Sequence, residues 1–109
     1  MIIVVVQIPV KRSREQAIKM QTESAPTFRA LASKGLLRKD YINGEAGGGG
    51  IYFWKSREAA DAWYTPEQRQ KIKAKFGVEP IITYYDTYVR VDNEAGKIIV
   101  HEEPVGAST

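Results

Sequence analysis

The chain has 109 residues, 43% of them hydrophobic and 27% charged, with a formal net charge of +3 and no cysteine. This length holds one domain with a modest core, and the composition is that of a folded globular protein rather than a disordered one. Without cysteine there is neither a disulfide nor a thiolate site, which fits a cytoplasmic location, and the net charge is too small to indicate a nucleic-acid partner.

The chain begins with a β-branched, apolar segment over residues 2–10, which predicts a strand closed by Pro9. This segment is far too short to cross a bilayer and lacks the basic start and cleavage site of a signal peptide, so we expect no membrane association. Ser13 then predicts the N-cap of a helix, because Gln16 three residues later completes a capping box.

This first helix is expected to bury one face, since five of its residues recur at spacings of three and four. They are Ala17, Met20, Ser24, Phe28 and Leu31. Pro26 removes a backbone donor and crowds the preceding turn, which predicts a kink or a break near residues 24–25. Gly35 predicts the end of the helical segment.

Two strands follow, over residues 36–43 and 50–55, joined by a connection rich in glycine. This composition predicts a hairpin loop that is longer than the tightest turns. A mobile loop that gates a pocket is the alternative. A phosphate loop is not expected, because a strand and not a helix N-terminus follows the glycines.

Two more helices are expected next. Ser56 predicts the N-cap of a helix that contains Trp63, and Thr65 with Pro66 predicts the start of another that Gly77 ends. The remainder predicts a long strand over residues 80–92, a turn, a short strand over residues 97–101 and a loose tail from residue 102.

The order of these elements is that of the ferredoxin-like split βαβ sandwich, an α+β fold with an antiparallel sheet. We therefore expect a ferredoxin-like α+β domain over residues 1–93, and a C-terminal hairpin or arm with its tail over residues 94–109. The strands at residues 2–8 and 51–54 are apolar on both faces, whereas the helices cover only one. A second copy of the chain is expected to cover the other face, which predicts an isologous homodimer.

Three segments resemble the YdhR family of mono-oxygenases: GLLRKDY at residues 35–41, EAGGGGIYFW at residues 45–54 and FGVEP at residues 76–80. The resemblance runs from the first strand to about residue 93, and residues 45–54 are its most specific part. The family belongs to the dimeric α/β-barrel superfamily. The resemblance therefore implies a dimeric α/β barrel and, less directly, a mono-oxygenase.

Haem-degrading members of that superfamily offer a test for a cofactor. Their tryptophan-x-serine segment and helix tryptophan resemble Trp54, Ser56 and Trp63, but the position of their haem-binding histidine holds Lys73. A protonated lysine does not ligate iron as an imidazole does. The resemblance therefore implies no haem, and no cofactor is expected.

Neither a metal nor a nucleic acid is expected from the remaining motifs. His101 is the only histidine and lacks further ligands at workable spacing, so an exposed polar residue is the simpler interpretation. The RNA-recognition domain shares this element order, but it stacks bases on aromatic residues of its first strand, and the first strand here has none.

Aromatic residues are the main candidates for a ligand site. They have two interpretations, packing in the core and dimer, or an apolar cavity between sheet and helices that holds a planar ligand. The residues expected to line such a cavity and bind the substrate are Tyr52, Trp54, Trp63 and Tyr84. The sequence does not decide which strand face borders the cavity.

Lys39 and Tyr41 are the candidate catalytic residues. They are two positions apart on one strand and so share a face, where their donors are predicted to stabilise an enolate or phenolate. A solvated or salt-bridged lysine, with Asp86 as the partner for example, is the alternative for Lys39.

These expectations favour a cofactor-independent mono-oxygenase that acts on a small aromatic or phenolic molecule in an internal apolar pocket. Once deprotonated, such a substrate supplies its own electrons to oxygen. The alternative is a non-oxidative barrel protein, either an isomerase-like enzyme or a small-molecule binding module without turnover.

Overall fold

The computed structural model describes residues 1–101, so the predicted tail from residue 102 lies outside the described residues. The elements follow in this order: β1 (Ile2–Ile8), α1 (Arg14–Ala30), the 3-10 turn η1 (Leu31–Lys34), β2 (Leu36–Gly44), β3 (Gly47–Trp54), α2 (Arg57–Trp63), α3 (Pro66–Phe76), β4 (Ile81–Asp86), β5 (Val89–Asp92) and β6 (Lys97–Val100).

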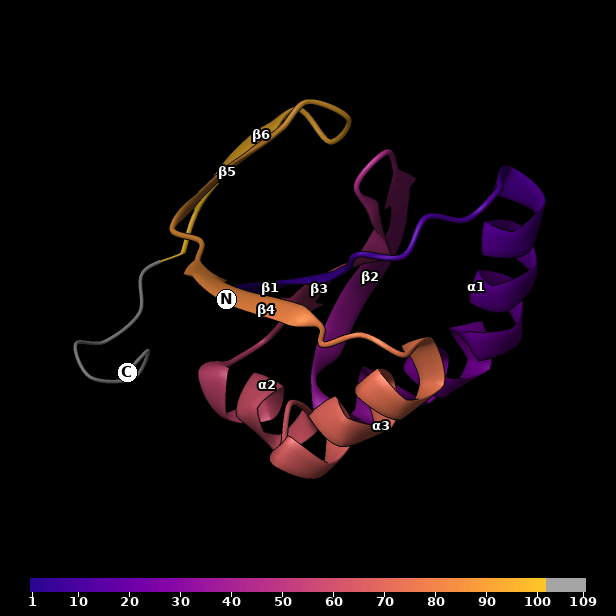
Figure 1. The fold of residues 1–109 in the computed structure, drawn as a ribbon. Helices are drawn as coiled ribbons and strands as arrows, with labels where there is room; N and C mark the ends of the chain where they lie inside the picture. The colour runs from indigo at the N-terminus through magenta and orange to yellow at the C-terminus, as the bar shows by residue number, and fades with distance from the viewer. Residues whose placement is uncertain (102–109) are drawn as a thin grey trace.

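Four strands form one antiparallel sheet in the order β2-β3-β1-β4, and the helices pack against one of its faces (Figure 1). The predicted α+β class and antiparallel sheet are confirmed, and the strand order is compatible with a ferredoxin-like fold. No helix in the described part of the chain combines the length and the apolar character needed to cross a membrane.

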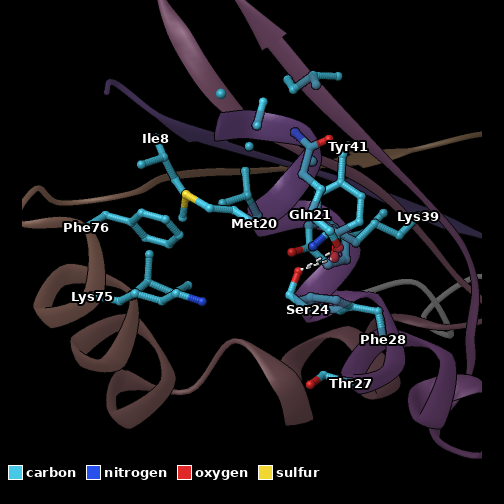
Figure 2. A pocket seen from close by; sticks show the side chains of 18 of the residues that line it. Ile8, Met20, Gln21, Ser24, Thr27, Phe28, Lys39, Tyr41, Lys75 and Phe76 are labelled. Carbon is cyan, nitrogen blue, oxygen red and sulfur yellow. Dashed lines mark hydrogen bonds between the residues drawn. The ribbon is translucent and has the colours of Figure 1, made fainter. Parts of the chain in front are cut away.

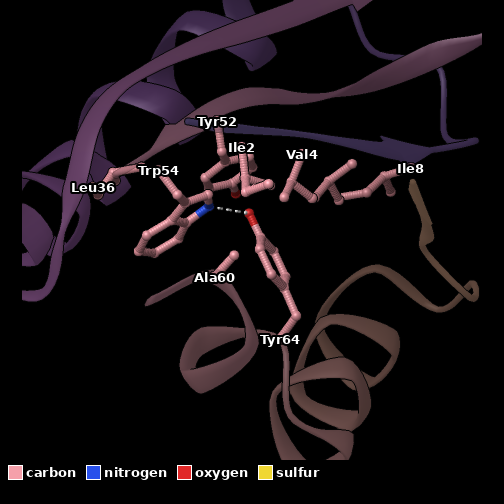
Figure 3. Close-up of a cluster of buried hydrophobic side chains, with 9 residues drawn as sticks. Ile2, Val4, Ile8, Leu36, Tyr52, Trp54, Ala60 and Tyr64 are labelled. Atoms are coloured by element: carbon pink, nitrogen blue, oxygen red, sulfur yellow. Dashed lines mark hydrogen bonds between the residues drawn. The ribbon is translucent and has the colours of Figure 1, made fainter. Parts of the chain in front are cut away.

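The helix-covered face of the sheet carries the hydrophobic core. From β1, four alternating side chains are buried in it: Ile2, Val4, Val6 and Ile8. Trp54 of β3 is fully buried, and its indole N–H donates a hydrogen bond of 3.2 Å to the Tyr64 hydroxyl (Figure 3). This bond gives both buried polar groups a partner, which lowers the cost of burying the two large rings.

The helices begin where the sequence predicts. Ser13 and Gln16 form the complete capping box of α1, each side chain accepting from the backbone N–H of the other. The side chains of Ser56 and Thr65 cap α2 and α3 in the same N-terminal manner. Gly77 ends α3 with a φ of 77°, a left-handed conformation that glycine adopts without strain.

The sequence predicts a kink or a break at Pro26, and the break does not occur, because α1 runs through this residue as one helix. Proline in a helix interior costs about 3 kcal/mol, because it removes one backbone hydrogen bond and crowds the turn before it. The residues on either side of it, Ala17 and Phe28, pack against the sheet side of the molecule. Tertiary packing on both sides of the proline therefore outweighs this local cost.

The glycine-rich segment is a strand and not the predicted loop. β3 begins at Gly47, and only Glu45 and Ala46 separate it from β2. Gly49 pairs with Gln7 of β1 and has a φ of 139°, and a Cβ there would overlap the carbonyl oxygen of Val6. Glycine is needed at this position because the neighbouring strand occupies the space of a side chain.

The predicted long strand over residues 80–92 is divided in two. β4 ends at Asp86, and β5 pairs with β6 in a separate hairpin that includes the predicted turn. The hairpin projects from the sheet on the side opposite α2 and α3 (Figure 1). The arm therefore begins at Val89, ahead of the predicted boundary at residue 93.

Candidate functional site

A cavity of about 240 Å³ lies between α1, α3 and the helix-covered face of the sheet. Figure 2 shows Lys39, Tyr41 and Ser24 at one end, with Lys75 and Phe76 of α3 at the other. Apolar and aromatic side chains form most of the wall, among them Val6, Ile8, Met20, Phe28, Tyr41, Tyr52, Trp63, Ile72 and Phe76. Drug-sized ligands need roughly 300–1,000 Å³, so this cavity suits a smaller molecule.

A β-bulge decides which side of the sheet the candidate catalytic residues face. The register of β2 against β3 shifts at Leu37, between Leu36 and Arg38. In a regular strand, residues 36 and 39 would point to opposite faces, because successive side chains alternate. The extra residue lets buried Leu36 face the helices and Lys39 and Tyr41 line the cavity on the same side.

Three aromatic rings surround the Lys39 side chain. Its Nζ lies 3.2 Å from the ring centroid of Phe28, 4.0 Å from that of Tyr41 and 4.5 Å from that of Tyr52. Lys39 forms no ion pair with any residue in the described part of the chain, so the alternative of a salt bridge to Asp86 is not realised.

Burial and, secondarily, the positive charge of Lys75 lower the pKa of Lys39 from 10.5 to about 7. The ring faces attract the ammonium, but they replace only part of the water that the charge loses. Both protonation states are therefore populated at neutral pH. Lys39 can accept a proton as the amine, and it can stabilise an anion as the ammonium.

Gly50 makes room for the Lys39 stem. A Cβ at residue 50 would lie 2.8 Å from the Cε of Lys39 and 3.1 Å from the Cε1 of Tyr52. Both distances are shorter than close-packed side chains tolerate. Gly50 lies directly opposite Tyr41 in the sheet, so its missing side chain opens the path by which Lys39 reaches the rings.

The Tyr41 hydroxyl lies 2.6 Å from the Ser24 Oγ, which also donates to the Gln21 carbonyl at 3.2 Å (Figure 2). Since serine has one hydroxyl proton, Tyr41 donates to Ser24 in this arrangement. Burial raises the pKa of Tyr41, and this rise is opposed by the hydrogen bond that Ser24 can donate to the phenolate form. Tyr41 is therefore a neutral hydrogen-bond donor beside the Lys39 amine.

The cavity wall is positively charged. Among its described residues there are four cationic side chains and no carboxylate; the cations are Arg12, Lys39, Lys71 and Lys75. The guanidinium carbon of Arg12 lies 4.8 Å from the Phe76 ring centroid, and the Lys75 Nζ lies 5.4 Å from it. These two cations therefore flank the end of the cavity away from Lys39, and the wall favours an anionic ligand.

Two of the four predicted substrate-binding residues line the cavity and two do not. Tyr52 and Trp63 line it. Trp54 is instead sealed in the core by Tyr64, and the Tyr84 ring lies 5.9 Å from the ring of Tyr64 on the side of β4. Trp54 and Tyr84 share the helix-covered face, but the core around Tyr64 fills that end of the sheet.

The sequence patterns did not indicate three of the four cationic residues of the wall, Arg12, Lys71 and Lys75, or the role of Gly50. Lys71 and Lys75 are four positions apart on α3, beside the apolar Ile72 and Phe76, so helical spacing could have indicated their common face. Arg12 and Gly50 carried no such signal, because their contacts to α3 and β2 depend on tertiary structure.

Two other sequence candidates lie outside the cavity. Lys73 is on the outer side of α3, where its Nζ pairs with the Glu79 carboxylate at 3.2 Å. His101 is partly buried and not exposed as expected, and its backbone N–H donates to the Tyr88 carbonyl at 2.6 Å. Within residues 1–101, no three histidine or acidic side chains gather as a metal site would need.

Comparison with known proteins assigns no family to the chain. Neither a protein-family model nor a curated protein matches it. The functional conclusion therefore depends on the geometry and charge of the cavity.

Proposed function

We propose that the protein is a cofactor-independent mono-oxygenase that binds a small phenolic aromatic molecule in the cavity. The observation that supports this most strongly is the Lys39 amine, which lies without an ion-pair partner among the described residues and against three aromatic rings in the cavity wall. The proposal agrees with the resemblance of residues 45–54 to the YdhR family. The proposal also includes a homodimer.

The wall is suited to holding a planar molecule in a dry site. Phe28, Tyr52 and Trp63 present ring faces and edges to the cavity and already contact one another, with the Phe28 centroid 5.7 Å from that of Tyr52 and 5.9 Å from that of Trp63. Stacked and edge-on contacts of this kind stabilise aromatic ligands and exclude water.

Lys39 then acts on the phenol proton. The neutral amine takes the proton, and the ammonium so formed pairs with the phenolate at short range in a site of low dielectric. The Tyr41 hydroxyl can turn from Ser24 to donate a hydrogen bond to the same oxygen. Together the two residues favour the electron-rich anion over the neutral phenol.

The anion supplies the electrons for oxygen reduction, so the reaction needs no bound electron carrier. For an anthrone-like polyphenol, one atom of O₂ forms a double bond to the methylene carbon of the ring system. The other atom leaves as water with the two hydrogens of that carbon. The carbon is oxidised and O₂ is reduced, which balances atoms and electrons.

Oxygen uptake with a panel of hydroquinones, naphthols and anthrones tests this proposal. We expect uptake above the uncatalysed rate, a loss of roughly 100-fold in Lys39→Met and a smaller loss in Tyr41→Phe. Lys73→Met, which alters a lysine outside the cavity, is the matched control and should retain the wild-type rate. Uptake by the wild-type protein no faster than the uncatalysed reaction would contradict an oxygenase.

A non-oxidative barrel protein, isomerase-like or a binding module, is the second candidate. The positive wall favours it, because such a wall attracts an anionic aromatic molecule whether or not a reaction follows. Quenching of Trp63 fluorescence by a bound aromatic ligand, with no oxygen consumed, would support this candidate over the oxygenase.

The open face of the sheet and the arm support a homodimer with sheet against sheet. The face turned away from the helices carries Ile3, Val5, Ile42, Ile51, Phe53, Ile81 and Tyr85. The arm exposes four further apolar side chains, each more than half accessible: Val89, Val91, Ile98 and Val100. Arg90 lies over the Phe53 ring at 5.7 Å, so the arm borders this face. A second copy would cover both apolar surfaces at once.

A further inference from the structure

The Lys39 amine has the position of a nucleophile as well as that of a base. Its Nζ lies in the cavity wall, its stem passes the open space at Gly50, and no described carboxylate holds it as an ammonium. An exposed lysine is almost wholly protonated at neutral pH, whereas Lys39 with a pKa of about 7 supplies far more of the free amine that attacks a carbonyl.

The groups around Lys39 are suited to a carbonyl compound that also carries an acid group. The ionisable side chains that line the cavity with it are Arg12, Tyr41, Tyr52, Lys71 and Lys75. Tyr41 lies beside the amine, and Arg12 and Lys75 flank the far end at Phe76. A short aromatic ligand can therefore reach Lys39 with one end and the cationic side chains with the other.

We propose that Lys39 forms a Schiff base with the carbonyl carbon of a small aromatic aldehyde or ketone whose carboxylate lies toward Arg12, Lys71 and Lys75. This activity goes beyond the proposed oxygenation and requires no oxygen. The same cavity and the same lysine serve both reactions, which differ in whether the ligand presents a phenol or a carbonyl group.

The step is a condensation. The amine nitrogen bonds to the carbonyl carbon and loses one of its two protons, and the carbonyl oxygen takes up a proton to give a carbinolamine. The carbon–oxygen bond then breaks, the oxygen leaves as water, and the nitrogen loses its remaining proton to give the imine. Tyr41 and Ser24, joined at 2.6 Å in the same wall, can supply and recover the proton that moves.

Reductive trapping tests the proposal on the whole chain. The protein is incubated without oxygen at pH 7 with 4-carboxybenzaldehyde and cyanoborohydride, which reduces an imine to a stable secondary amine, and peptide mass spectrometry locates the adduct. We expect Lys39 to be modified at least about tenfold faster than any exposed lysine, because far more of it is unprotonated.

Two variants and a pH series show whether the adduct depends on the Lys39 amine. Lys39→Arg keeps the charge and removes the nucleophile, so total labelling should fall to the slow rate of the exposed lysines. Lys73→Arg should leave the labelling of Lys39 unchanged. The rate at Lys39 should be half-maximal near pH 7, whereas the rates at exposed lysines should still rise above it.

The acid group is tested with the uncharged amide, 4-carbamoylbenzaldehyde, which has nearly the same size. We expect the carboxylate to label Lys39 roughly two- to fivefold faster, and Arg12→Gln with Lys75→Gln to remove that advantage. An equal rate for both aldehydes would overturn the placement of the acid group.

Labelling of Lys39 no faster than that of exposed lysines would overturn the Schiff base itself. Lys39 would then be an ammonium that only packs against the three rings. Because oxygen is excluded, this outcome is independent of the result of the oxygen-uptake assay. Absence of oxygen uptake together with selective trapping would overturn the oxygenase and support the imine.

Discussion

Lys39 is placed at a cost to the stability of the fold. Its amine loses water on burial, is repelled by the like charge of Lys75 across the cavity (Figure 2) and has no carboxylate partner in the described part of the chain. Contacts with the faces of three rings offset part of this loss. A group whose charge is unfavourable in the folded state is typical of sites that use its reactivity.

The first prediction is that Lys39 makes stability depend on pH. Below about pH 7 Lys39 is charged in both the folded and the unfolded state, so the folded protein bears the full cost of burying that charge. Between about 7 and 10.5 the unfolded chain keeps a proton that the folded chain releases, so stability rises with pH. From pH 7 to about pH 9.5, the free energy of unfolding of wild type should rise relative to that of Lys39→Met by on the order of 1–3 kcal/mol.

Urea unfolding at several pH values measures this difference. Lys39→Met is the reference for wild type, because the two proteins share every other titrating group. Lys39→Met should also be the more stable protein at pH 7, since it fills the same space without a charge. Parallel pH profiles for the two proteins would show that Lys39 has an ordinary pKa.

The second prediction concerns Gly50. In Gly50→Ala the new methyl group meets the flexible Cε of Lys39, so we expect the lysine to move toward the cavity mouth while the sheet remains intact. Its pKa should return toward the ordinary value, because the amine regains water. A carbon-13 NMR titration of the lysine Cε signals measures this, with Gly44→Ala as the control, since no atom lies within 4 Å of a Cβ there.

At the scale of the elements, β3 brings two different requirements together in one strand. Its first half is glycine, which allows β1 to approach closely and leaves space for the cavity. Its second half presents Tyr52 and Trp54 to the helices. Along the helix-covered face, β3 therefore runs from the cavity to the hydrophobic core.

The third prediction is that Gly49→Ala destabilises the protein far more than Gly44→Ala. A residue at a φ of 139° is strained by roughly 1–3 kcal/mol, and overlap of the methyl group with the Val6 carbonyl adds to this. We expect a total loss of more than about 3 kcal/mol in urea unfolding, against less than about 1 kcal/mol for Gly44→Ala. Similar losses at the two positions would mean that β3 does not approach β1 as described.

At the scale of the whole molecule, two apolar surfaces have no partner within the described chain. They are the face of the sheet opposite the helices and the arm of β5 and β6. A chain of this size buries a modest core, so association of two copies would add substantially to its stability.

The fourth prediction is therefore that the protein sediments as a dimer at micromolar concentration and that Ile51→Lys converts it to a monomer. Ile51 is central on the open face, paired between Val5 and Asp40, and a charge there would be buried in the interface. Ile18→Lys places the same charge at an exposed position of α1 and should remain dimeric. A wild-type monomer at that concentration would contradict the dimer.

Much of the fold could be predicted from particular residues. Ser13, Ser56 and Thr65 each mark a helix start by a side chain that caps a backbone group three positions away. The candidate site was predicted less well. Lys39, Tyr41, Tyr52 and Trp63 line one cavity, but Trp54 is buried in the core and Tyr84 packs against the core from β4. Strand alternation indicates which face a side chain is on, but not how far along that face the cavity extends.

By itself the sequence determined what depends on interactions a few residues apart: the helix ends, the alternation of β1 and the α+β order of elements. Only the tertiary structure decided which face of β2 borders the cavity, because that follows from the bulge at Leu37 against β3. It also decided the pKa of Lys39, since burial, the three rings and the charge of Lys75 come from segments far apart in the chain. Desolvation and charge repulsion depend on which groups are close in the folded protein, and neighbouring positions in the sequence do not show this.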